Sequence, residues 1–433
     1  MRLAGYFWPG PIPGLCAVLA LASTAWAGTS SREIARELVF GQQGTEQGEF
    51  KQPAALALTA ERDLYVADAK KDTVERFSQF GKFLKPLTPS QGTFEGPIGV
   101  TVDARGNVFV AETRGNRVRK FDPAGKELAV FGRTGSAPGL FGSPRGIAVG
   151  SSGHIFVADY YNSRIQELDN DGRFVRAFTF RMPDQPAPVQ PRGVGVDYRD
   201  RLYGVYGGIN RIVRFNADGD AEFIFGTYGR LPGYLNDPRY ITFDIRDNIY
   251  VSDLRNHRVQ KFDEQGMFLG SFGGRGSAQG QFNEPQGIAV DPEGNLYVAD
   301  GENCRVQILV VNEYRRNLNL GLWNFRQQDF ARAAFHYEEV MRNDPQNKEA
   351  MESLVTSYRT LSERAFSTGD TSGAKKYLGG ILRLRPGNSD ARAKLRSLVW
   401  EENRSDLYYP TVGLGIVLAL VFVASLFFRF LKA

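Results

Sequence analysis

The chain has 433 residues, of which 42% are hydrophobic and 23% are charged, and this globular composition excludes a disordered or collagen-like protein. The formal charge of +5 is spread along the chain, so we expect no nucleic-acid partner. Only three His and two Cys are present, which excludes a zinc finger, an iron–sulfur cluster, a c-type haem and a disulfide framework. The sequence therefore predicts no bound metal and no cofactor. Because catalytic residue types are scarce, it also predicts that the chain is not an enzyme.

Residues 1–27 are predicted to form a secretory signal peptide. A short apolar run is followed by Ala25-Trp26-Ala27, which has small residues at the two positions that a signal peptidase reads. We expect cleavage after Ala27, and an uncleaved N-terminal anchor is the alternative. Cleavage would remove Cys16 and leave Cys304 without a partner for an internal disulfide.

The middle of the chain repeats six times. Each repeat opens with a Pro, and the separations between them are 44 residues and then 47 four times. The six are Pro53, Pro97, Pro144, Pro191, Pro238 and Pro285. About a dozen residues after the Pro, most copies have an apolar strand ending in an acid, as in Leu296–Asp300. Turns with Gly separate this strand from its neighbours, so each repeat contains four short strands.

A single four-stranded sheet cannot bury both of its faces, but six sheets packed around an axis can. We therefore predict a six-bladed β-propeller over residues 34–311. The sixth copy runs out of strand after Val311, and Glu37–Gly41 matches the missing fourth strand. This N-terminal strand would close the last blade and remove the free sheet edges. The fold class is mainly β, with an α-helical C-terminal part.

The repeat resembles the NHL repeat. The sixth copy shows the pattern in Pro285–Asp291, Gly294–Asp300 and Asn303–Val306. The resemblance covers about residues 34 to 311. It implies a six-bladed propeller that is used mostly to bind proteins or other ligands, and it implies that a few relatives with this fold are enzymes. Copy four departs from the pattern, because Leu202–Gly208 contains no acid. Copy one has Thr73 where the others have Arg.

The strand-end acids and the Arg found five residues later are interpreted as structural braces of the hairpin between them. One such pair per blade is what a repeated structural bond looks like. The acids are Asp68, Glu112, Asp159, Asp253 and Asp300, and the basic residues are Arg117, Arg164, Arg258 and Arg305.

The residue after the opening Pro is Arg in three consecutive copies, at Arg145, Arg192 and Arg239. This position starts the innermost strand, so we expect the three Arg at the mouth of the channel, where they would bind carboxylate or phosphate. Four Tyr are expected in loops on the same face, namely Tyr160, Tyr161, Tyr206 and Tyr240. The hypothesis is a site for an acidic protein segment or an anionic envelope polymer. The alternative is that these Arg pair with nearby backbone or acids.

Residues 318–402 change to a helical period and resemble tetratricopeptide (TPR) repeats, with one copy ending at Pro345 and a weaker one at Pro386. Residues 410–428 follow without a charge and would span about 28 Å as a helix, close to the ~30 Å hydrocarbon core. Arg429 and Lys432 mark the cytoplasmic side, so residues 429–433 are predicted to form a short cytoplasmic tail. The helical repeats are either a stalk or a peptide-binding groove.

Together these features predict a single-pass membrane protein whose N-terminal bulk is extracytoplasmic, either periplasmic or at the cell surface. Its predicted function is that of a binding scaffold, with the propeller face and the helical repeats recruiting a protein or an anionic envelope ligand. The first alternative is a propeller hydrolase or lyase that uses metal bound by channel carboxylates. The second is an envelope sensor that acts through a membrane partner.

Overall fold

The computed structural model describes residues 33–184 and 187–402. The chain divides into two units, Met1–Asn319 and Leu320–Ala433. The predicted signal peptide at 1–27 lies outside the described residues, as do the predicted membrane segment at 410–428 and the tail at 429–433. Within the described ranges, no helix is long and apolar enough to cross a membrane.

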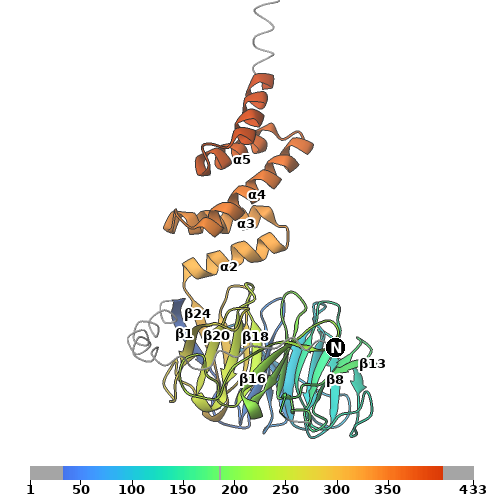
Figure 1. Cartoon of the computed structure of the whole chain (residues 1–433). Helices are drawn as coiled ribbons and strands as arrows, with labels where there is room; N and C mark the ends of the chain where they lie inside the picture. Colours follow the sequence, from blue (N-terminus) through green and yellow to red (C-terminus); the bar gives the residue numbers. More distant parts are fainter. Residues whose placement is uncertain (1–32, 185–186, 403–433) are drawn as a thin grey trace, which may run out of the picture. The chain divides into compact units, whose positions relative to one another are not determined.

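The first unit is a six-bladed β-propeller, as predicted, and each blade is a four-stranded antiparallel sheet (Figure 1). Blades 1 to 3 comprise β2 (Pro53–Leu58), β3 (Leu64–Asp68), β4 (Thr73–Phe77) and β5 (Phe83–Leu87); β6 (Pro97–Val102), β7 (Val108–Glu112), β8 (Arg117–Phe121) and β9 (Glu127–Phe131); and β10 (Pro144–Val149), β11 (Ile155–Asp159), β12 (Arg164–Leu168) and β13 (Phe174–Phe178). Blades 4 to 6 comprise β14 (Gly193–Val196), β15 (Leu202–Tyr206), β16 (Arg211–Phe215) and β17 (Ala221–Phe225); β18 (Pro238–Phe243), β19 (Ile249–Asp253), β20 (Arg258–Phe262) and β21 (Phe268–Gly273); and β22 (Pro285–Val290), β23 (Leu296–Asp300), β24 (Arg305–Val311) and β1 (Ile34–Phe40). Three short 3-10 helices follow the second strands of blades 4 to 6, namely η1 (Gly207–Ile209), η2 (Leu254–Asn256) and η3 (Gly301–Asn303).

The hydrophobic core lies between neighbouring blades. The second strand of every blade is buried at all five positions, including both sheet faces, as in β3 and β23. This burial explains why the sequence of these strands is a continuous apolar run rather than an alternation. One core cluster joins Leu64 and Phe77 of blade 1 to Val306 of blade 6, and similar clusters fill the other interfaces.

The N-terminal strand completes the last blade, whose strand order is β1-β24-β23-β22. β1 pairs antiparallel with β24, and Leu38 lies opposite Ile308 while Phe40 lies opposite Val306. The Phe40 ring packs 5.0 Å from Phe77 of blade 1, measured between ring centroids. β1 therefore both pairs within blade 6 and packs against blade 1.

The C-terminal part is helical, with α2 (Glu313–Arg326), α3 (Phe330–Asn343), α4 (Lys348–Ser367), α5 (Thr371–Leu384) and a fifth helix over residues 389–402. Side-chain caps begin three of them, since Asp329, Asn347 and Asp370 each accept a hydrogen bond from a backbone N–H in the first turn. Antiparallel neighbours pack through small residues: a Cβ built on Gly380 of α5 would lie 2.6 Å from the Tyr358 ring of α4.

Replacing Phe40 with Ala is expected to lower the free energy of unfolding of the propeller by about 3 kcal/mol, because it leaves a cavity where β1 packs on blade 1. The matched control is Phe80→Ala, at a side chain that is 64% exposed, where we expect a change within about 0.5 kcal/mol. Urea unfolding followed by far-ultraviolet circular dichroism measures both. Equal stability of the two variants would contradict the closing role of β1.

Candidate ligand site at the mouth of the channel

Three Arg side chains gather where the first strands of blades 3, 4 and 5 begin. Arg145 and Arg239 are the second residues of β10 and β18, and Arg192 directly precedes β14. The first strands of neighbouring blades contact each other around the channel. The same register in three adjacent blades therefore brings the three side chains to one sector of one mouth.

Two of these Arg lie over the ring of Tyr160. The guanidinium carbon of Arg145 is 3.8 Å from the centroid of the Tyr160 ring, and that of Arg192 is 5.6 Å from the same ring. Stacking on an aromatic face stabilises a guanidinium and fixes its plane. Tyr161 is the next residue, is 69% exposed and has its ring centroid 5.3 Å from that of Tyr160.

A single carboxylate, that of Asp237, forms the ion pairs of the other Arg at this mouth. Asp237 lies 2.9 Å from Nη2 of Arg239, 3.3 Å from Nε of Arg192 and 3.6 Å from Nε of Arg255. Arg145 has no such partner: its Nε is buried without a hydrogen bond, and no carboxylate of the described residues lies within ion-pair distance of it. We call Arg145, Arg192, Arg239, Arg255 and Asp237 the mouth cluster.

The mouth cluster carries positive charge that it does not neutralise. Burial and the adjacent Arg192 lower the pKa of Arg145, and burial and the adjacent Arg239 lower the pKa of Arg192. Both effects disfavour the charged form, yet Arg remains protonated in proteins. An anion placed among these groups would relieve the repulsion and replace the lost hydration, so the arrangement favours anion binding.

Gly207 makes room for the cluster in blade 4. A Cβ at this position would lie 2.6 Å from Cδ of Arg192 and 2.6 Å from the carbonyl oxygen of Pro238. Any larger residue would therefore displace Arg192. Sequence reasoning missed Gly207, Asp237 and Arg255; the contiguous Asp237-Pro238-Arg239 was the available signal for the acid.

Two of the predicted Tyr do not lie in loops. Tyr206 was expected in a loop of this face, but it is the last residue of β15 and is fully buried, packing 5.1 Å from Phe180. It stands where the other blades have their acid, and its ring fills the interface between blades 3 and 4 instead. This part of the prediction is wrong, because a large apolar ring at that position is more stable in the core than at the surface.

Tyr240 belongs to a strand, not to a loop. It lies in β18 of blade 5, and its hydroxyl donates a hydrogen bond to the carbonyl oxygen of Ile98 in blade 2. Those blades face each other across the ring, so the side chain reaches across the channel. Burial raises the pKa of Tyr240, which keeps the phenol neutral and able to donate.

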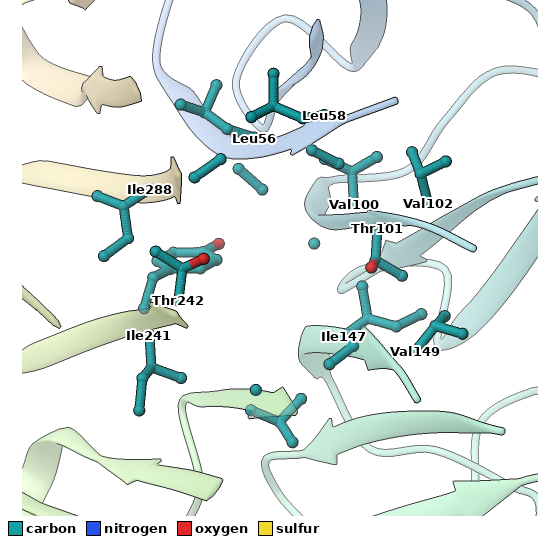
Figure 2. Close-up of a pocket in the computed structure, with 18 of the residues that line it drawn as sticks. Leu56, Leu58, Val100, Thr101, Val102, Ile147, Val149, Ile241, Thr242 and Ile288 are labelled. Atoms are coloured by element: carbon teal, nitrogen blue, oxygen red, sulfur yellow. The ribbon is translucent and has the colours of Figure 1, made fainter. Parts of the chain in front are cut away.

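Below this mouth the channel is a cavity of about 230 Å³ whose lining side chains are mostly apolar. The first strands of all six blades line it, with side chains such as Leu56, Val100, Ile147 and Ile288 (Figure 2). Its wall carries no carboxylate and no imidazole. Within the described parts of the chain, no three or more His, Cys, Asp and Glu are grouped so as to hold a metal ion.

Carboxylates do lie at the opposite mouth, in the turns after the first strands. Asp103, Asp197 and Asp200 line a neighbouring pocket there. Asp103 accepts backbone hydrogen bonds from Arg105 and Asn107, which is the bonding of a turn-stabilising acid. Asp197 accepts backbone hydrogen bonds from Arg199 and Arg201 in the same way, whereas Asp200 accepts from Ser151 of the neighbouring blade.

The predicted braces form ion pairs within the hairpins. The distances between the Arg and the acid are 2.8 Å for Arg117 and Glu112, 2.8 Å for Arg164 and Asp159, 2.9 Å for Arg258 and Asp253, and 2.8 Å for Arg305 and Asp300. The acids are fully buried and also accept backbone N–H groups from the preceding loop, as Asp159 does from Gly142. In blade 1, where Thr73 replaces the Arg, Asp68 accepts four backbone N–H groups instead.

The family model of the NHL repeat matches residues 94–121, 141–168 and 282–309, which are three stretches in blades 2, 3 and 6. These are NHL repeats. The NHL propeller also resembles solved structures. A protein of unknown function from Bacteroides thetaiotaomicron is 14% identical, with a TM-score of 0.54, 64% of this chain covered and 76% of that chain. A gluconolactonase from Xanthomonas campestris is 17% identical, with a TM-score of 0.50 and coverages of 66% and 93%. A streptogramin B lyase is 16% identical, with a TM-score of 0.46 and coverages of 64% and 98%. No curated protein matches the chain.

The prediction that the chain is not an enzyme is wrong, because an enzymatic function is not excluded. The gluconolactonase shares this fold, so the scarcity of catalytic residue types in the composition does not decide the question. At 17% identity the similarity shows the fold alone, and it does not show that the NHL propeller of this chain catalyses a reaction.

We predict opposite outcomes for two Arg of blade 3. Arg164→Gln removes the partner of a buried acid and should lower the free energy of unfolding by about 3 kcal/mol. Arg145→Gln removes a half-buried charge that lacks an acidic partner, so stability should stay unchanged or rise. Urea unfolding of the two variants against the native chain measures the difference. A loss of stability in Arg145→Gln as large as in Arg164→Gln would show that Arg145 is structural.

Proposed function

We propose that the chain is a membrane-anchored, extracytoplasmic binding scaffold whose mouth cluster binds a carboxylate-bearing or otherwise anionic ligand. The observation that supports this most is the environment of Arg145. Its guanidinium is half-buried, lies beside Arg192 and Arg239 and has no acidic partner. Stability alone would not retain such a group, because an unpaired buried charge is costly. Arg also offers a planar pair of donors that fits a carboxylate, as Lys does not.

The contacts around the cluster prepare it for binding. Tyr160 fixes the plane of Arg145, and Asp237 holds Arg192 and Arg239 in place. Side chains held in their bound geometry lose little conformational entropy when a ligand arrives. The ligand is an acidic protein segment or an anionic envelope polymer.

The helical unit is proposed to provide a second surface built from TPR-like hairpins. Small residues under aromatic rings support this, as at Gly321, where a Cβ would lie 2.8 Å from the Tyr337 ring. A stalk that only spaces the propeller from the membrane is the alternative role.

The compartment is proposed from the predicted signal peptide at 1–27 and the predicted membrane segment at 410–428. Alkaline phosphatase, which folds only outside the cytoplasm, should be active when fused after Glu402. Green fluorescent protein fused after Ala433 should fluoresce in the cytoplasm. An inactive phosphatase fusion that accumulates to normal levels would contradict this topology.

The anion site is tested with the full-length chain and labelled polyglutamate. The double variant R145Q/R192Q should bind the polymer at least about tenfold more weakly, because hydrogen bonds to charged groups contribute about 1.5–3 kcal/mol each. The control R105Q/R173Q makes the same charge change at two exposed turn residues and should bind as the native chain does. Native affinity should also fall as salt is raised. Equal binding by both double variants would overturn the proposal.

A hydrolase or lyase is the second candidate, favoured by the fold shared with a gluconolactonase. An enzyme that binds metal through carboxylates of the channel is not supported, because the residues lining the channel cavity include no Asp or Glu. Incubation of the purified chain with gluconolactone, with and without added divalent cation, tests it. Turnover above the uncatalysed rate would favour the enzyme over the scaffold. An envelope sensor remains a third role, and it would need a partner in the membrane.

A further inference from the structure

Four of the loops that join one blade to the next share one backbone conformation. Each contains the same isolated parallel bridge, and in each a Gly N–H donates to the carbonyl oxygen six residues later at 3.0 to 3.1 Å. The bridges are Gln43 with Phe50, Thr134 with Phe141, Tyr228 with Leu235, and Arg275 with Phe282. Because the backbones match, the side chains can be compared position by position.

The loop between blades 4 and 5, residues 226–236, differs from the other three in its exposed side chains. It carries Tyr228, Leu231 and Tyr234, which are 67%, 66% and 41% exposed. The corresponding residues are Gln43, Glu46 and Glu49; Thr134, Ala137 and Leu140; and Arg275, Ala278 and Gln281. All four loops are described in full, and the other three carry no exposed large hydrophobic side chain. The conformation therefore does not require aromatic residues, and a cluster of them in solvent indicates a binding surface.

This loop, which we call the aromatic loop, runs directly into the mouth cluster. Its last residue, Asn236, precedes Asp237, and the backbone N–H of Arg255 donates to the Asn236 carbonyl oxygen at 3.1 Å. Arg258 donates to the carbonyl oxygens of Leu231 and Tyr234 at 2.9 and 2.8 Å. These bonds hold the aromatic loop in one conformation beside the positive charge.

We propose that the aromatic loop and the mouth cluster form one docking surface for an acidic protein segment. A carboxylate of that segment would bind at Arg145 and Arg192, and apolar side chains next to it would pack on Tyr228, Leu231 and Tyr234. The charge part of this inference rests on the proposed anion site. The apolar part distinguishes a polypeptide from an anionic polysaccharide, because an exposed aliphatic side chain such as Leu231 finds its complement in apolar side chains. Tyr and Arg together are also the residues that dominate protein–protein interfaces.

The experiment selects a displayed library of short random peptides on the purified full-length chain. We expect enrichment of peptides with Asp or Glu next to aliphatic or aromatic residues. The best of them should bind at least about tenfold more tightly than polyglutamate and alginate of similar charge. The test variant Y228T/L231A/Y234Q places in the aromatic loop residues that the equivalent loops already contain, so its fold should be retained. The control L84T/L128T/L269T removes three exposed apolar side chains from the outer strands of blades 1, 2 and 5.

The outcomes separate the two proposals. In the aromatic-loop variant the selected peptide should lose at least about tenfold in affinity while polyglutamate binding stays unchanged, and in R145Q/R192Q both should weaken. Unchanged peptide binding in the aromatic-loop variant, or polyglutamate or alginate binding as tight as the peptide's, would overturn the docking surface and leave the anion site standing. Unchanged binding of every probe in R145Q/R192Q would overturn the anion site itself. If the selection on the native chain enriches no peptide, the inference is overturned.

Discussion

The pairing of β1 with β24 is the interaction on which the rest of the propeller depends. Each blade buries apolar residues on both faces, so each needs a neighbour on both sides, and a ring is the arrangement that provides this for all six. β1 supplies the last strand of the ring and packs Phe40 against blade 1. The closed ring then sets where each first strand begins, and with it the spacing of Arg145, Arg192 and Arg239. A weaker closure would loosen the mouth cluster as well as the core.

Blade 4 departs from the repeat next to the mouth cluster. The other blades tie their second hairpin to the preceding loop with a buried acid, as Asp159 and Asp253 do. Blade 4 has Tyr206 there, whose ring stabilises the interface with blade 3 but leaves its hydroxyl without a hydrogen bond. The next residue, Gly207, has no side chain and admits Arg192. The departure from the repeat thus coincides with the centre of the positive sector.

The sequence predicted what depends on period and register. The spacing of the Pro residues and the acids defined six blades and the closing strand, and the register placed three Arg on neighbouring blades. It did not predict side-chain directions that are decided by contacts between distant segments. Tyr206 turns into a blade interface, Tyr240 crosses to Ile98, and Asp237 pairs with three Arg from different parts of the chain. Composition was also the wrong basis for excluding catalysis. Activity depends on the residues of a particular site, and neither the overall composition nor the fold decides it.

The hydrogen bond from Tyr240 to Ile98 has a mechanical consequence. Blades 2 and 5 stand on opposite sides of the ring, so this contact acts as a strut across its diameter. The strut limits how far the mouth can widen, and the Tyr240 side chain also lines the cavity of the channel. The ligand that we propose for the Arg residues would therefore meet a mouth whose width is set in part by this one contact across the channel.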